Sequence, residues 1–159
     1  MRALSIHQPY ASFIIENIKF HETRSWRPHK NMIGETFAIH ASKTTRTMHM
    51  LRNFVKENDP TDNATRLLCK TALEFLDNDI DNTISYGAII GTARINYVID
   101  CMGASAHRIS ILEKSLGNWS QGNYAWHLAD VCAIDPIQWK GQQGWFHVPD
   151  ELIAEAQQS

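Results

Sequence analysis

The sequence lacks the features that mark membrane, secreted and zinc-dependent proteins. No run approaches eighteen consecutive apolar residues, and residues 7–9 interrupt the apolar N-terminal stretch, which argues against a membrane span and a secretory signal. Cysteine is scarce: Cys69, Cys101 and Cys132 are an odd number without C-x-x-C spacing, so neither a disulfide framework nor a cysteine-based zinc site is expected. H-E-x-x-H and G-x-x-x-x-G-K patterns are also missing. We therefore predict a cytoplasmic protein with reduced thiols, no membrane association, no metal site and no cofactor.

An excess of charge is also lacking, since the net charge is only −2. The charges are nevertheless unevenly distributed. Residues 1–56 carry nine Lys and Arg against three Glu, a balance of +6, and they hold five of the eight histidines. The remaining residues have a balance of −8. The first third therefore has the sign expected of a surface that faces phosphate, although charge also fluctuates along sequences without a functional reason.

Short strand patterns alternate with helical patterns along the chain. The length of 159 residues and the 43% of hydrophobic residues suit one domain with a real core. We predict strands over residues 2–7, 19–26, 35–42, 86–99, 124–131, 134–139 and 144–148. Helices are predicted over residues 9–17, twice within 44–83, over 105–117 and after Pro149. These patterns predict an α+β fold over residues 1–159, a small and mostly antiparallel β-barrel with a helical insertion at 44–83.

Polar and basic side chains lie beside aromatic ones in the first third of the sequence. Alternation along a strand would place Glu22, Arg24 and Trp26 on one face and Lys19, His21 and Thr23 on the other, unless the preceding junction reorients Lys19. Arg24 would then lower the pKa of Glu22 and keep it ionised, which suits a base or an orienting group. His7, His21 and His40 could converge as general acid and base, but such histidines more often bind backbone or lie at the surface.

Several short motifs together resemble the ASCH domain, a family named for the C-terminal region of activating signal cointegrator and placed among the PUA-like β-barrels. The matching residues are Leu4-Ser5-Ile6-x-Gln8-Pro9-x-Ala11-Ser12, Ile18-Lys19-x-x-Glu22-x-Arg24-Ser25-Trp26, Ile39-x-Ala41, Gly87-x-Ile89-x-Gly91, Tyr124-Ala125-Trp126-x-Leu128, Trp139-Lys140-Gly141 and Trp145-Phe146. The resemblance implies a barrel with a first helix beside a cleft, a cleft lined by the segment from Lys19 to Trp26, and a role in binding RNA or other nucleic acid.

The same resemblance raises an enzymatic alternative. Some small members act as amidohydrolases on N4-acetylated cytidine through a Lys, a Thr three residues later and a distant Glu, and a ribonuclease activity has been described for another member. Lys19 matches the Lys, but Glu22 occupies the position of the Thr. The activated hydroxyl is therefore missing. We keep Lys19 and Glu22 as candidate catalytic residues of a hydrolase.

The principal hypothesis is a basic, aromatic-lined cleft that binds single-stranded RNA or a modified nucleotide. Its candidate binding residues are Gln8, Pro9, Tyr10, Lys19, Arg24, Ser25, Trp26, His40, Ser42, Lys43 and Tyr124. The alternation of Trp126 with Tyr124 and Leu128 favours the barrel core for Trp126 over base stacking, whereas Trp26 suits either role. A protein partner could also bind the insertion at 44–83.

Overall fold

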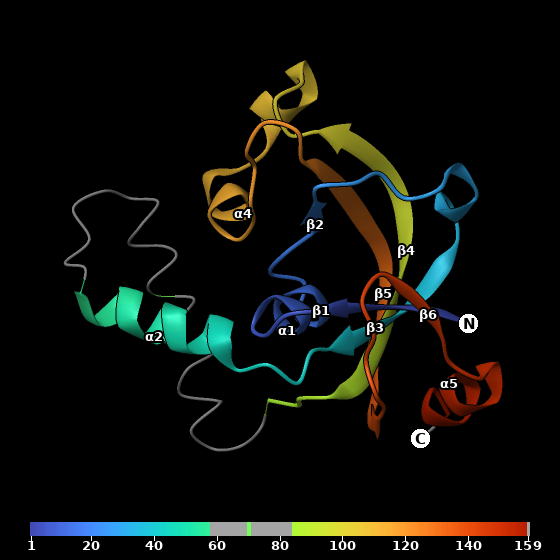
Figure 1. Cartoon of the computed structure of the whole chain (residues 1–159). Helices are drawn as coiled ribbons and strands as arrows, with labels where there is room; N and C mark the ends of the chain where they lie inside the picture. Colours follow the sequence, from blue (N-terminus) through green and yellow to red (C-terminus); the bar gives the residue numbers. More distant parts are fainter. Residues whose placement is uncertain (58–69, 71–83, 159) are drawn as a thin grey trace.

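A mixed β-sheet forms the framework of the protein and curls into a half-barrel (Figure 1). The computed structural model describes residues 1–57, 70 and 84–158. Within these residues the strand order is β2-β5-β4-β3-β1-β6. The strands are β1 (Arg2–Ile6), β2 (His21–Arg24), β3 (Thr36–Ala41), β4 (Ala88–Asp100), β5 (Tyr124–Gln138) and β6 (Trp145–His147). β1 and β3 run parallel and the other neighbouring pairs are antiparallel, which confirms the predicted α+β class and the mostly antiparallel sheet.

Short helices connect and flank the strands. They are α1 (Tyr10–Ile15), η1 (Lys30–Met32), α2 (Arg46–Glu57), η2 (Ala104–Arg108), α4 (Ile111–Ser115) and α5 (Asp150–Ala156). α1 buries Ala11, Phe13 and Ile14. Ala11 and Ile14 are three residues apart and pack into the main core with the strands, whereas Phe13 packs on another side of the helix against Leu116. The chain leaves α1 through Asn17, whose φ of 55° is a left-handed conformation that asparagine tolerates better than most residues.

Aromatic side chains fill the concave side of the sheet. The Trp126 side chain of β5 is fully buried, as predicted, and its ring packs edge-to-face on Trp26 at 4.7 Å between centroids. Trp145 of β6 stacks on Trp126 at 5.9 Å and also lies edge-to-face with Trp26 at 6.3 Å between centroids. Trp26 follows the edge strand β2 and Trp145 lies on the opposite edge strand, so the three indoles connect the two edges of the half-barrel. Such aromatic pairs add about 0.5–1.5 kcal/mol each beyond area burial.

The long strands depart from the predicted boundaries. Residues 124–138 form one strand rather than two, because β5 continues to pair with β4 past Asp130, whose φ is 50°. A register shift between Ile95 and Tyr97 of β4 also interrupts the alternation of side chains that a regular strand would have. Ile95 is therefore buried while Tyr97 is 43% exposed, since a bulge turns the following side chains to the other face.

The predicted helix over 105–117 is two short helices instead of one. Ser110 between η2 and α4 is extended, and its hydroxyl accepts a hydrogen bond from the N–H of Glu113 at 3.1 Å. Serine in this role begins a new helix.

The insertion at 44–83 is described only in part. Its first predicted helix is present as α2, which projects away from the sheet (Figure 1), and the second lies outside the described residues. Among the described helices, none is long and apolar enough to span a membrane.

Candidate functional site

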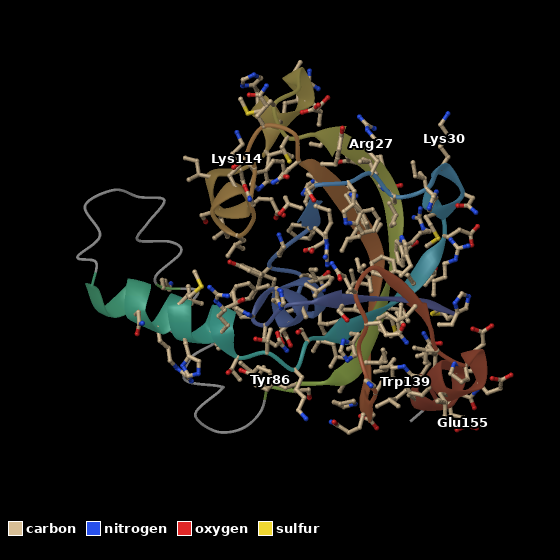
Figure 2. All side chains as sticks on the ribbon, viewed as in Figure 1. Arg27, Lys30, Tyr86, Lys114, Trp139 and Glu155 are labelled. Atoms are coloured by element: carbon tan, nitrogen blue, oxygen red, sulfur yellow. The ribbon has the colours of Figure 1, made fainter. Side chains whose placement is uncertain are left out.

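A cleft of about 840 Å³ opens at one end of the sheet. Its walls come from distant parts of the chain: β1, β2, β3, residues 42–44, residues 86–87 and residues 138–144. Figure 2 shows two of its lining residues, Tyr86 and Trp139, at this end of the molecule. The volume is within the range of ligand-binding clefts, about 300–1,000 Å³.

The described part of the cleft lining carries positive charge. Arg24, Lys43 and Lys140 line the cleft together with His7 and His40, and no Asp or Glu of residues 1–57, 70 and 84–158 is among the lining residues. A concave surface with one sign of charge concentrates field lines and attracts ligands of opposite charge. The cleft therefore favours anions.

Another cavity, of about 680 Å³, lies beside the N-terminus and has mixed charge. Arg2 lines it together with Glu35 and Asp150. The carboxylate of Asp150 pairs with the N-terminal ammonium of Met1. Because its positive groups have acidic neighbours, this cavity is a poorer anion site than the cleft.

His40 lies at the bottom of the cleft with both ring nitrogens engaged. Its Nε2 is 3.1 Å from the carbonyl oxygen of Trp139, which can only accept, so the hydrogen-bond network assigns the proton to Nε2. Nδ1 then accepts from the Ser5 hydroxyl at 3.0 Å. Burial lowers the pKa of His40 and outweighs the Trp139 carbonyl, which raises it. His40 is therefore a fixed, neutral ring at neutral pH.

Arg24 joins the edge strand β2 to β1 across the cleft. Its Nη2 donates to the Ser5 carbonyl at 2.6 Å, and its Nε lies 2.9 Å from Oε1 of Glu22. Glu22 and Arg24 thus share one face of β2, as the alternation predicts. The carboxylate of Glu22 does not line the cleft but holds the guanidinium that does.

The loop between β5 and β6 passes closely over the floor of the cleft. A Cβ at Gly141 would lie 2.3 Å from Cε1 of His40 and 2.8 Å from the Ser5 oxygen. Only a residue without a side chain fits this approach. Gln138 at the end of β5 and the loop residues 139–144 therefore form a wall of the cleft that packs against His40.

The candidate residue Lys19 lies outside the cleft lining. Its side chain is fully buried, its Nζ donates to the Leu116 carbonyl at 2.8 Å, and the Tyr10 ring centroid is 5.6 Å away. Burial lowers the pKa of Lys19, against the opposing influence of Glu22 and Glu113. Tyr10 also has a raised pKa, first because of burial and second because of Glu22. Lys19, Tyr10 and Glu22 thus form an interior group that the 116–117 segment covers.

His21 lies on the opposite face of β2 from Glu22. Its Nδ1 is 3.3 Å from Oε1 of Glu113, and its ring packs against His127 at 5.0 Å between centroids. Of the three histidines considered as acid and base, His7 and His40 line the cleft and His21 does not. The alternation of side chains along β2 explains this separation.

The structure distributes the predicted binding residues over several environments. Those that line the cleft are Arg24, His40, Ser42 and Lys43. Those outside its lining are Gln8, Pro9, Tyr10, Lys19, Ser25, Trp26 and Tyr124. Gln8 is buried and bonds to Ser85 and Ser12, whereas Tyr124 packs under the Arg27 guanidinium at 4.4 Å. Ser25 is exposed just beyond β2 and Pro9 is buried beside α1.

Several residues that line the cleft were not predicted from the sequence, and most of them lie at 138–144, opposite His40. The unpredicted lining residues include Ser5, Tyr86, Gln138, Trp139, Lys140 and Gly141. The signal available in the sequence was the run of Trp, Lys, Gly and Gln at 139–144 between two strands, a polar loop that carries an aromatic ring and a cation. Its partner across the cleft is about a hundred residues away in the chain, which no local pattern reveals.

Comparisons with known proteins identify the fold. The model of the ASCH domain matches residues 4–138. A crystal structure of ASCH from Zymomonas mobilis is 14% identical, has a TM-score of 0.52, and is matched over 94% of this chain and 88% of that chain. A serine-to-alanine mutant of the Zymomonas mobilis protein is also 14% identical, with a TM-score of 0.51 and 97% and 92% coverage. At this identity the two structures show the fold alone. No curated protein sequence matches the chain significantly.

Proposed function

Because the chain belongs to the ASCH domain family, whose PUA-like fold is generally RNA-binding, we propose that it binds single-stranded RNA or a modified nucleotide in the cleft. The observation that carries the proposal is the lining of the cleft, in which Arg24, Lys43 and Lys140 occur and to which no carboxylate of the described residues contributes. Lysine and arginine side chains around a groove are the usual partners of a nucleic-acid backbone.

The two lysines are available for phosphate. Both side chains are exposed, and no Asp or Glu among the residues that the structure describes forms an ion pair with either of them. Trp139 and Tyr86 add aromatic rings to the same cleft. A base that stacks on such a ring gains about 1–3 kcal/mol.

A salt-dependent titration tests the proposal. We expect labelled single-stranded RNA to bind and the affinity to fall as salt rises, with a log–log slope that reports the number of phosphate contacts. A variant with Lys43→Ala and Lys140→Ala should have a slope shallower by about 1.4, since each contact to a single strand contributes about 0.7. Lys30→Ala is the matched control, because Lys30 is exposed and lies far from Trp139 (Figure 2). Absent or salt-independent binding, or a double variant that behaves like the control, would contradict the proposal.

Hydrolysis of RNA or of an N4-acylated cytidine is the second candidate function. The observation that favours it is the lowered pKa of the buried Lys19 amine, since a lysine that loses its proton more readily is better suited to proton transfer. Glu22 would act as base or orienting group. The Lys19 amine donates to the Leu116 carbonyl, and a substrate would have to replace this carbonyl as the hydrogen-bond acceptor.

Incubation with N4-acetylcytidine and, separately, with single-stranded RNA tests the hydrolase. We expect product to form with the unaltered protein and not with Lys19→Met, a change that keeps the length of the side chain. Equal product with both proteins would refute a role of Lys19.

A further inference from the structure

The positive charges of the cleft are arranged by depth. Arg24 and His40 are its most deeply placed basic residues, with a side chain 25% exposed for Arg24 and a residue 2% exposed for His40. Lys43 and Lys140 are exposed at the opening. We call the deep part of the cleft around Arg24 and His40 the floor, and the opening with Lys43 and Lys140 the rim. The floor and the rim differ in net charge, and this difference would orient a bound nucleotide.

The floor of the cleft is electrically balanced. The Glu22 carboxylate lies 2.9 Å from Nε of Arg24 and compensates its charge. His40 is neutral, because Nδ1 accepts from Ser5 and burial lowers its pKa. A phosphate at the floor would therefore lose its hydration without gaining a net countercharge, which is unfavourable.

The floor nevertheless presents hydrogen-bond donors. A guanidinium has five N–H groups. In Arg24, Nε faces Glu22 and one N–H of Nη2 is taken by the Ser5 carbonyl. The remaining N–H groups, on Nη1 and Nη2, have no partner among the described residues. Because two contacts hold the group, these donors have a fixed direction and suit a planar acceptor such as the carbonyl edge of a base.

The rim has the opposite character. The aliphatic carbons of Lys43 pass 3.6–3.9 Å from the position of a Cβ on Gly87, so the stem lies against the wall while the side chain is exposed. Lys140 lies in the loop that forms the facing wall. Two exposed ammonium groups that form no ion pair with a described residue attract phosphate without a large desolvation cost.

We propose that an unpaired ribonucleotide enters the cleft base first, with a carbonyl of the base accepting from Arg24 at the floor and its phosphates held by Lys43 and Lys140 at the rim. This inference rests on the proposed function and assigns the direction of binding within it. Glu22 is then a positioning residue, because it holds Arg24 in place and balances its charge.

Ligand fragments separate the contributions of base and phosphate. We expect uridine 5′-monophosphate to bind more tightly than either uridine or ribose 5-phosphate, with uridine binding insensitive to salt. A single-stranded oligouridine should bind at least about tenfold more tightly than an abasic strand of equal length, as expected for the loss of one well-placed base contact. The affinities of the monophosphate and the oligonucleotide are then compared. Equal affinities indicate that the ligand is a free nucleotide, and a higher affinity for the oligonucleotide indicates a strand.

Variants then assign each contribution to a residue. Arg24→Lys keeps the floor charge but loses the planar fork, so the affinity for oligouridine should fall about tenfold with an unchanged salt slope. Lys43→Ala should reduce the salt slope and leave uridine binding unchanged. Glu22→Gln should weaken uridine binding, and Glu22→Asp should restore it in part. Thermal unfolding of each variant checks that it folds.

Failure of the inference and failure of the proposed function give different results. If the strands bind with the expected salt dependence but the abasic strand binds as well as oligouridine, or Arg24→Lys reduces the salt slope, the cleft binds RNA without base-first entry. If no strand or nucleotide binds at all, the proposed function itself is wrong.

Discussion

Replacing Gly141 by alanine tests the geometry of the cleft floor most directly. The added Cβ would lie 2.3 Å from Cε1 and 2.7 Å from Nδ1 of His40, and 2.8 Å from the Ser5 oxygen. The imidazole has no room to turn away, because it is 2% exposed and bonded to both Ser5 and Trp139. The variant must therefore displace the loop or break the His40 bonds.

The expected cost follows from these contacts. Adding a methyl to a packed site costs about 1–3 kcal/mol, and loss of one His40 hydrogen bond adds about 1 kcal/mol. We expect Gly141→Ala to lower the free energy of unfolding by about 2 kcal/mol or more on these grounds. Removal of the ring by His40→Ala should make the same alanine much less costly, which gives a coupling of about 1–3 kcal/mol in a double-mutant cycle.

Urea unfolding of the four proteins of the cycle measures both quantities. Gly103→Ala is the control for a milder contact, because a Cβ there would lie 3.3 Å from the Asp100 carbonyl oxygen, which requires a shift of only a few tenths of an ångström. If Gly141→Ala costs less than about 0.5 kcal/mol, the size of an ordinary surface substitution, or if His40→Ala does not reduce its cost, the loop does not pack on His40 as described.

The other predictions concern the groups beside β2. Burial by itself would raise the pKa of Glu113. The opposite effect of the His21 side chain, the N–H groups of Phe20 and His21 and the charge of Lys19 is larger, so the pKa of Glu113 lies below the ordinary value of 4.5. A carboxyl with a depressed pKa stabilises the fold above its unfolded pKa and loses this contribution as pH falls through the folded pKa. We therefore expect Glu113→Gln to cost about 1.5–3 kcal/mol at pH 7, with a difference from the unaltered protein that shrinks below pH 4.5 in urea unfolding; a constant difference would contradict this. For Lys19, whose pKa burial lowers from 10.5, the unfolded chain binds more protons near that pH, so stability should rise relative to Lys19→Met as pH increases toward 10.5. A pH-independent difference between the two proteins would refute the burial of the charged amine.

Local patterns in the sequence predicted most of the framework. The alternation of β2 placed Glu22 beside Arg24 and opposite His21, and both relations occur in the structure. Trp126 was assigned to the core from its spacing, and it is fully buried. These features depend on neighbours within a few residues, which is the range that periodicity and backbone preference report.

Local patterns could not predict the direction of the Lys19 side chain or the length of β5. Lys19 precedes β2, so the alternation of the strand does not apply to it, and the carbonyl that receives its amine comes from Leu116. β5 continues past Asp130 because β4 offers it a partner. Both outcomes depend on segments that are remote in sequence.

The sequence by itself determined the fold class, the order of most strands and helices, and the concentration of basic residues in the first third, because each is a property of local pattern or composition. Only the tertiary structure decided which of those residues form a site. It placed Arg24 and His40 against a loop from the other end of the chain, turned Lys19 into the interior, and neutralised the floor while leaving the rim charged. The physical reason is that exposure, charge balance and hydrogen-bond direction arise from contacts across the sheet, and these exist only once its strands have paired.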